Sequence, residues 1–255
     1  GRKMSGHSKW ATTKHKKGAL DKARGKLFAK LIRQVEVAAR EGGGDPEANP
    51  TLRTMFQKAR DASVPMETIE RAIKRGTGEL EGVRYEHVSY EGYAPGGVAL
   101  IVECLTDNRN RTGADVRSIF SRNGGSTAEP GAVSWQFQRK GVVIVSRRPG
   151  APSEDDLILA VAEAGADDVR DNGDGWEVLC PPGELAAVRA AVERQSWQVS
   201  SAELAMVSSQ SVPVDNEPDA KKVLRLIDAL DEHDDVQAVW SNADIPDSVM
   251  ELVEI

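Results

Sequence analysis

Residues 141–179 read GVVIVSRRPGAPSEDDLILAVAEAGADDVRDNGDGWEVL, and their pattern predicts the fold of much of the second half of the chain. Its apolar runs and turn residues predict a strand, a helix and two short strands, over residues 141–146, 154–164, 168–170 and 176–179. A further helix ending at Arg194 and a strand over residues 198–207 extend the order to βαββαβ. That order is typical of a ferredoxin-like unit, so we expect one compact α/β domain here.

The segments on either side of this unit predict a second sheet. Before the unit, the pattern indicates two strands, a helix and a third strand, over residues 85–90, 98–105, 111–122 and 132–137. After the unit, residues 219–231 are typical of a helix and residues 236–240 of a strand. We expect these last two elements to complete the sheet that begins at Tyr85. The βαββαβ unit is then an insertion in the sequence of the other α/β domain.

The region before both sheets has a helical pattern. From Leu20 to Arg40 the apolar residues recur every three or four positions, which marks one face of an amphipathic helix. Three glycines at residues 42–44 end this helix, and Pro50 and Pro65 mark the starts of two further helices. Three helices in so short a stretch predict a small all-α domain.

The chain as a whole is therefore predicted to be α+β, with a small N-terminal three-helix domain followed by two ferredoxin-like α/β domains, the second inserted in the first. The expected parts are a basic N-terminal arm, a helical domain, an α/β domain in two pieces and an inserted βαββαβ domain, over residues 1–19, 20–79, 80–139 plus 211–255, and 140–210. The arm is set apart because residues 6–17 are small, polar and basic and show no periodicity.

Charge divides the chain into two unlike parts. Up to Gly76 there are eighteen Lys or Arg and eight Asp or Glu, a balance of +10, and the remainder carries −17 within a total of −7. A basic module on an acidic body is typical of a protein that contacts a polyanion. The arm groups its cations around the indole ring of Trp10, which favours nucleic acid because bases stack on aromatic rings.

The candidate nucleic-acid contacts are cations and two stacking rings in four groups. They lie in the arm, along one face of the first helix, at the end of the third helix and after the second strand of the first sheet. The residues are Lys9, Trp10, Lys14, His15, Lys16 and Lys17; Lys22, Lys26, Lys30 and Arg33; Arg71, Lys74 and Arg75; and Arg109 and Arg111. A solvated tail and a polar strand-to-helix turn are the alternatives for the first group and the last.

The sequence gives little support for catalysis, and we predict a protein that is not an enzyme and needs no cofactor. The four histidines are scattered, no His and Cys pair has the spacing of metal ligands, and no Gly-x-Ser-x-Gly motif occurs. A minor alternative is a magnesium-dependent nuclease that uses Asp107 and Asp115. The acidic residues between Asp228 and Asp235 are expected to form a solvated face, and no small-molecule substrate is evident.

The cysteines and the hydropathy indicate the cellular compartment in which the protein is expected. Cys104 and Cys180 each lie in an apolar strand-like run, where two reduced core thiols are expected. No apolar run approaches the roughly 20 residues that span a bilayer. The basic N-terminus is not followed by the apolar block of a signal peptide. We therefore predict a cytoplasmic protein without a membrane partner.

Five motifs carry a resemblance to a known family. They are MSGHSKW, KHKK, AAREGGGDP, ERAIKRGTG and LTDNRNRT, at residues 4–10, 14–17, 38–46, 70–78 and 105–112. In these motifs the chain closely resembles the YebC/PmpR family, which includes the mitochondrial translational activator of cytochrome oxidase. It departs slightly at Thr12 and Thr13, where relatives usually have Asn and Ile. The resemblance spans Met4 to Ile255 and implies one helical domain and two α/β domains.

The resemblance implies two different functions. Such proteins are labelled probable transcriptional regulators that bind promoter DNA, and they are also described as ribosome-associated factors that help peptide-bond formation at difficult sequences, notably proline runs. The charge distribution favours the second function, because an acidic body repels a long duplex whereas a basic arm orders on folded RNA. We predict a ribosome- and RNA-binding translation factor that contacts rRNA and tRNA, with promoter DNA as the alternative partner.

Overall fold

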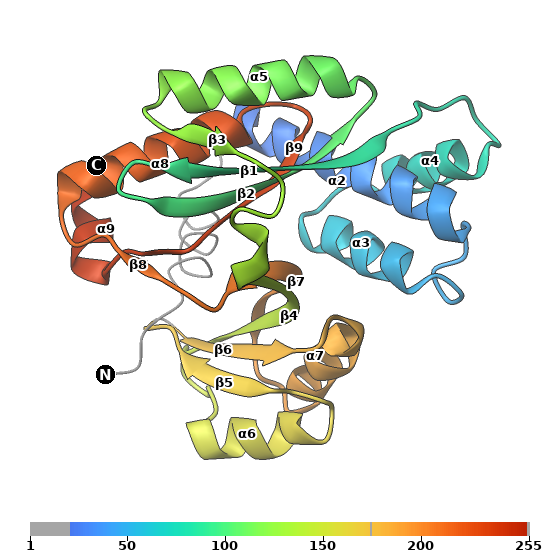
Figure 1. Cartoon of the computed structure of the whole chain (residues 1–255). Coiled ribbons are helices and arrows are strands. Elements are labelled where there is room, and N and C mark those ends of the chain that lie inside the picture. The colour runs from blue at the N-terminus through green and yellow to red at the C-terminus, as the bar shows by residue number, and fades with distance from the viewer. Residues whose placement is uncertain (1–20, 174, 254–255) are drawn as a thin grey trace.

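The computed structural model describes residues 21–173 and 175–253, and over these residues it confirms an α+β protein (Figure 1). Three helices come first, namely α2 (Asp21–Gly42), α3 (Pro50–Asp61) and α4 (Met66–Thr77). They pack around a core of their own, which includes Leu31, Val35, Leu52 and Ile69. The predicted N-terminal helical domain is therefore confirmed.

The ends of these helices follow from local chemistry. The side chain of Asn49 accepts a hydrogen bond from the backbone N–H of Leu52 at 3.1 Å and so caps α3. Pro50 follows in the first turn, where its missing N–H removes no helical hydrogen bond. α4 ends at Gly78, whose φ of +87° is the left-handed conformation that glycine adopts without strain.

The first sheet has four strands in the order β3-β1-β2-β9, and each neighbouring pair is antiparallel. The strands are β1 (Glu86–Ala94), β2 (Val98–Thr106), β3 (Ser126–Ala128) and β9 (Val236–Ser241). Because β9 comes late in the chain and pairs with β2, the expectation that the late elements complete this sheet is confirmed.

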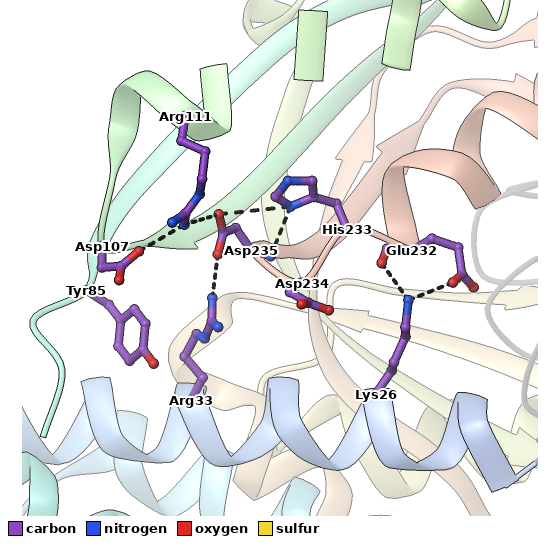
Figure 2. Close-up of a pocket in the computed structure, with 9 residues that line it drawn as sticks. All are labelled: Lys26, Arg33, Tyr85, Asp107, Arg111, Glu232, His233, Asp234 and Asp235. Carbon is purple, nitrogen blue, oxygen red and sulfur yellow. Dashed lines mark hydrogen bonds and ion pairs between the residues drawn. The ribbon is translucent and has the colours of Figure 1, made fainter. Parts of the chain in front are cut away.

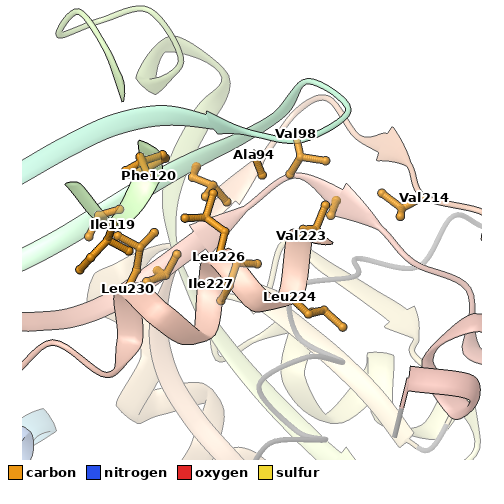
Figure 3. Close-up of a cluster of buried hydrophobic side chains, with 14 of the residues drawn as sticks. Ala94, Val98, Ile119, Phe120, Val214, Val223, Leu224, Leu226, Ile227 and Leu230 are labelled. Atoms are coloured by element: carbon orange, nitrogen blue, oxygen red, sulfur yellow. The ribbon is translucent and has the colours of Figure 1, made fainter. Parts of the chain in front are cut away.

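Two helices pack on one face of this sheet, namely α5 (Arg109–Arg122) and α8 (Glu217–Asp231). Figure 3 shows the core between helices and strands, with Phe120 of α5, Leu226 of α8 and Val98 of β2 among its members. Three short elements complete this part of the protein, namely β8 (Val212–Pro213), β10 (Ala243–Asp244) and α9 (Asp247–Val253).

The second sheet has the order β5-β6-β4-β7 and is also antiparallel throughout. Its strands are β4 (Phe137–Ser146), β5 (Asp168–Asp171), β6 (Gly175–Cys180) and β7 (Val199–Ser208). The helices α6 (Glu154–Ala162) and α7 (Leu185–Arg194) share a core with this sheet. The chain order is βαββαβ, as the stretch 141–179 predicts, and it lies in the sequence between β3 and β9 of the first sheet.

A shared apolar layer joins the two sheets. It contains residues from both sheets, among them Ala99, Ile101, Trp240, Val142, Ile144 and Leu179. β2 is buried at eight of its nine positions, because alternate residues face this layer and the core beneath α5 and α8. The α/β domains therefore form one acidic body, to which the helical domain is attached.

One predicted strand, over residues 132–137, is wrong. Most of this segment forms a turn and the 3₁₀ helix η1 (Ser134–Gln136), and the unpredicted strand β3 lies before it. The carboxylate of Glu91 accepts hydrogen bonds from three backbone N–H groups, those of Gly131 (2.6 Å), Val133 (3.0 Å) and Ser134 (2.7 Å). Backbone groups satisfied in this way need no strand partner. Burial alone raises the pKa of Glu91, but these hydrogen bonds lower it below its ordinary value.

Two further expectations concern the basic arm and the domain boundaries. The basic arm over residues 1–19 lies outside the described residues. The domain boundaries after residues 79, 139 and 210 stay predictions. Within residues 21–173 and 175–253, no helix combines the length and the apolar character that crossing a membrane requires.

Candidate nucleic-acid interface

A pocket of about 580 Å³ lies between the helical domain and the acidic body (Figure 2). Its walls come from α2, from the segment that enters β1, from the start of α5 and from the turn between α8 and β9. The lining residues are Lys26, Arg33, Tyr85, Asp107, Arg111, Glu232, His233, Asp234 and Asp235. Cations from two predicted groups, one on α2 and one at the start of α5, therefore meet at a single place.

The lysines of α2 dock onto the C-terminal end of α8. Lys26 Nζ donates to the backbone oxygen of Glu232 at 2.8 Å and to its carboxylate at 2.7 Å. One turn further along α2, Lys30 Nζ donates to the backbone oxygen of Asp231 at 2.5 Å and lies 3.4 Å from its carboxylate. Carbonyl groups at a helix C-terminus carry partial negative charge, so α8 attracts these cations through its backbone as well as its side chains.

Two arginines converge on Asp235, whose side chain is only 6% exposed. Arg33 Nη1 donates to Oδ1 at 3.0 Å, and Arg111 Nη2 donates to Oδ2 at 2.9 Å. Thr112 Oγ1 donates to Oδ2 as well, at 2.7 Å. Burial alone raises the pKa of Asp235, but the hydrogen bonds from Arg111, Thr112 and Arg33 lower it below its ordinary value. Asp235 is therefore the anion at which α2 and α5 are joined.

The expectation of a solvated acidic face between Asp228 and Asp235 is wrong for two of its members. Asp235 is buried, and Asp231 is covered by Lys30. The reason is tertiary, because α8 ends where the basic face of α2 passes. The sequence analysis missed these acidic partners, although five carboxylates that would otherwise repel one another are a sign that a cationic partner lies nearby.

The two carboxylates considered for magnesium bind different partners within the chain. Asp115 lies 2.8 Å from His233 Nε2, and Asp107 lies 2.9 Å from Arg111 Nη2. Among the described residues, no group of three or more His, Cys, Asp or Glu side chains is placed to hold a metal ion. The nuclease hypothesis for Asp107 and Asp115 gains no support from this arrangement.

Asn108 caps α5 by accepting a hydrogen bond from the backbone N–H of Arg111 at 3.1 Å. The two arginines of this turn then separate. Arg111 turns to Asp235, whereas Arg109 stays exposed and lies 3.5 Å from Glu86 in a loose ion pair. The polar turn is confirmed as the structural role of Asn108, and a contact of Arg109 and Arg111 with nucleic acid stays a prediction.

The cations at the end of α4 differ in their surroundings. Arg75 Nε lies 2.7 Å from the carboxylate of Glu36, which is 6% exposed, so Arg75 fastens α4 to α2. Arg71 and Lys74 are exposed and form no ion pair with any residue that the structure describes. These two side chains are therefore available to a partner from outside the chain.

Seven predicted contacts fall outside the residues or side chains that the structure describes. Lys9, Trp10, Lys14, His15, Lys16 and Lys17 lie outside the described residues. Lys22 belongs to the first turn of α2, but its side chain also lies outside the described part. The role of this whole group stays a prediction.

Comparison with known proteins shows two matching family models. The model of the "TACO1/YebC protein N-terminal domain" matches residues 8–79. The model of the "TACO1/YebC second and third domain" matches residues 85–243. Together they cover the helical domain and both sheets.

Individual proteins are similar over nearly the whole chain. A relative from Thermobifida fusca, named "Probable transcriptional regulatory protein", is 58% identical over 248 residues, which are 97% of this chain and 98% of the relative. A relative of the same name from Mycobacterium marinum is 56% identical, with the same coverage. The crystal structure of a conserved hypothetical protein from Aquifex aeolicus has a TM-score of 0.78 and 45% identity, and the match covers 88% of this chain and 91% of that one. The chain therefore belongs to the TACO1/YebC family.

Proposed function

We propose that this protein is a non-enzymatic, RNA-binding translation factor that acts at the ribosome and assists peptide-bond formation at difficult sequences, such as proline runs. Its relatives from Thermobifida fusca and Mycobacterium marinum are named probable transcriptional regulatory proteins, which supports regulation of gene expression through a nucleic acid. The ribosomal form of that role follows the YebC/PmpR resemblance, and the cytoplasm is its expected location.

The choice of RNA over duplex DNA rests on one observation. Cations of α2 contact acidic residues of the same chain. Lys26, Lys30 and Arg33 pair with the end of α8 and the turn after it. A DNA reader of known type places a recognition helix with free base-reading side chains in the major groove, and Lys26, Lys30 and Arg33, the cations of α2 that the structure describes and the sequence predicted, are not free in this way. A basic arm that binds the phosphates of folded RNA fits this distribution of charge better.

The proposal gives each group of residues a role. Lys9, Lys14, Lys16 and Lys17 neutralise phosphates, and Trp10 or His15 stacks on an RNA base. Arg71 and Lys74 extend the same contact from the end of α4. Such a factor accelerates peptidyl transfer by holding the tRNA ends in a reactive geometry, without donating a catalytic group. Its partners are rRNA and tRNA.

Lys26, Lys30 and Arg33 of α2 bind RNA only where a phosphate group displaces the carboxylate that each of them contacts within the protein. The Lys26–Glu232 pair has side chains 32% and 70% exposed, so solvent screens it and it contributes at most about 1 kcal/mol. The Arg33–Asp235 pair at the other end is far more buried. An RNA phosphate should therefore displace a carboxylate most easily at the N-terminal end of α2. In the sequence, the basic arm comes directly before that end.

Promoter DNA is the alternative partner, and it agrees with the relatives' name "Probable transcriptional regulatory protein". A promoter-binding regulator requires sequence-dependent affinity for a duplex that outlasts competitor DNA at physiological salt. Measuring duplex affinity in the presence of competitor DNA therefore distinguishes a promoter-binding regulator from a ribosomal factor.

Co-sedimentation of the full chain with ribosomes tests the proposal. We expect the wild type to pellet with ribosomes and the Lys14→Ala, Lys16→Ala, Lys17→Ala triple variant to remain in the supernatant. The control variant Arg194→Ala, Lys222→Ala, Arg225→Ala removes three exposed cations from the acidic body and should sediment like the wild type. If the wild type does not sediment with ribosomes but binds a promoter duplex in a sequence-dependent way, the ribosomal role is wrong.

A further inference from the structure

Helix α6 presents apolar side chains on the side that faces away from its own core. Leu157 and Val161 are buried and pack with the second sheet. Leu159 is nevertheless 75% exposed, the largest exposed fraction of any large apolar side chain among the described residues, and Ile158 beside it is 41% exposed. Ala162 is exposed as well, three positions from Leu159 and four from Ile158. Because side chains at these spacings are neighbours on a helix, Ile158, Leu159 and Ala162 form one continuous apolar strip.

Carboxylates border this apolar strip. Asp155 and Asp156 lie four and three positions before Leu159, and Glu163 lies four positions after it, in the cap residue that continues the helical backbone of α6. All three acids are exposed, and none forms an ion pair within the described part of the chain. The helix itself carries no cation that could balance them. The outward side of α6 is therefore an apolar strip with an unbalanced acidic border.

Single apolar side chains on a protein surface are ordinary and need no explanation. The strip on α6 differs because its members are continuous and because acids lie around them. Protein interfaces typically combine an apolar centre with a polar border in this way. Figure 1 shows α6 at the lower end of the molecule, with β5 above it and no labelled element below it. The strip is therefore accessible to a partner.

The charges around the strip decide what kind of partner fits it. The three carboxylates repel the phosphate groups of a nucleic acid. Two copies of the chain joined strip to strip would bring acids against acids, which is unfavourable for the same reason. A basic protein with an apolar side chain or groove satisfies both features, because its cations face the carboxylates while its apolar surface covers Leu159.

We infer that the outward face of α6 is a docking site for a basic protein, with Leu159 as the apolar anchor. Asp155, Asp156 and Glu163 then pair with lysine or arginine side chains of that protein. Its identification as a protein of the ribosome rests on the proposed function. A ribosome presents both RNA phosphates and cationic proteins, so the basic arm and α6 hold the factor at two points. Two linked contacts bind more tightly than either contact alone.

The test compares two leucine variants of the full chain, Leu159→Gln on α6 and Leu252→Gln on α9. Leu252 is 52% exposed and so provides a matched control, and glutamine has nearly the helix propensity of leucine. A third variant, Asp155→Asn with Glu163→Gln, removes two carboxylates of the border. Binding is measured with purified ribosomes, with ribosomal proteins freed of RNA and with an RNA hairpin, each over a range of salt. Thermal melting shows that all variants are folded.

We expect Leu159→Gln to bind ribosomes and the RNA-free ribosomal proteins about tenfold more weakly than the wild type, and Leu252→Gln to stay within about twofold. The carboxylate variant should also bind more weakly, and its binding should respond less to salt, because fewer ion pairs form. The hairpin should bind the wild type and Leu159→Gln equally. A photoreactive amino acid in place of Leu159 should cross-link to a basic protein of the ribosome.

The outcomes separate the docking site from the proposed function. If the wild type binds ribosomes and Leu159→Gln matches Leu252→Gln, the inference fails and the proposed function stands. If the wild type binds the RNA-free proteins through Leu159 but does not bind ribosomes, the inference stands and the proposed function fails. If it binds neither, both fail. If Leu159→Gln instead weakens hairpin binding alone, or dissociates a dimer seen by analytical ultracentrifugation, the occupant is RNA or a second copy and the inference is wrong.

Discussion

Arg33 of α2 and Asp235 of the turn before β9 lie 202 positions apart in the chain, yet Arg33 Nη1 donates to Asp235 Oδ1 at 3.0 Å. Arg33 is held further by the backbone oxygen of Leu105, at 2.8 Å, and by the ring of Tyr85, whose centre lies 4.5 Å from its guanidinium carbon. The helical domain is thus fastened to the acidic body at a buried carboxylate, and the more exposed lysine contacts extend outward from there.

Replacing Asp235 with Asn should therefore destabilise the protein by about 3 kcal/mol at neutral pH, because two arginines lose the anion that balances them. The effect should depend on pH. The folded-state pKa of Asp235 is lowered, so its contribution is fully present well above the unfolded value of about 3.9 and is lost as pH falls through the folded value. Thermal melting of the wild type and of Asp235→Asn, compared from neutral to acid pH, should show curves that converge in acid.

The matched control is Asp234→Asn, in the same turn but exposed. Its stability should stay within about 0.5 kcal/mol of the wild type at neutral pH. A difference between wild type and Asp235→Asn that stays constant down to strongly acid pH would contradict the role of the ionised carboxylate.

The close crossing of α2 and α4 gives a second prediction. A Cβ added to Gly76 would lie 2.8 Å from the Cβ of Ala39 and would also meet the backbone oxygen of Glu36. Gly76→Ala should therefore cost about 2 kcal/mol, measured from the urea midpoint. Gly25→Ala, whose added Cβ meets no described atom within 4 Å beyond its chain neighbours and the backbone of its own helix, should be neutral or stabilising by up to about 1 kcal/mol. Equal effects of the two substitutions would show that helix propensity, and not close packing, decides the outcome at Gly76.

Much of the fold was predictable because its signals are local. The apolar run 141–146, the proline and glycine breaks between the first three helices, and the turn around residues 172–175 each act within a few positions. The segment 132–137 was not predictable from its own residues. Its backbone is satisfied by Glu91, about 40 positions earlier, and β3 is a three-residue strand that exists only through its pairing with β1.

Only part of the site was predictable, because its ion pairs join residues that lie far apart in the sequence. The helical spacing of Lys26, Lys30 and Arg33 places them correctly on one face of α2. Their partners, however, lie more than 200 positions away, as the separation of 206 between Lys26 and Glu232 shows. A charge pattern read along the sequence reveals a cationic face but does not reveal that an acidic turn of the same chain already covers it.

The two cysteines give a third prediction. Burial raises the pKa of Cys104 to about 12 and that of Cys180 to about 11, so at pH 8 almost no reactive thiolate is present. Iodoacetamide should leave both thiols unmodified in the native protein and should alkylate both in urea, as measured by mass spectrometry. Rapid alkylation of the native chain at either position would contradict the buried placement of that residue.

The competition between phosphate and carboxylate at α2 gives the last prediction. Neutralising the end of α8 with Asp231→Asn and Glu232→Gln should tighten binding of an RNA hairpin about fivefold, because two lysines lose carboxylate competitors that are each worth about 0.5 kcal/mol. The salt slope should also become steeper by about two, since each freed lysine then exchanges a counterion for a phosphate. Fluorescence anisotropy over a salt series measures both quantities.

The control for this pair of substitutions is Asp155→Asn with Asp156→Asn, on the exposed surface of α6. It changes the net charge by the same amount but frees no cation, so it should raise affinity only slightly and leave the salt slope unchanged. If the two variants behave alike, overall charge explains the gain, and the acidic end of α8 does not compete with RNA for α2. If only the α8 variant changes the slope, the contact seen between Lys26 and Glu232 occupies a phosphate site.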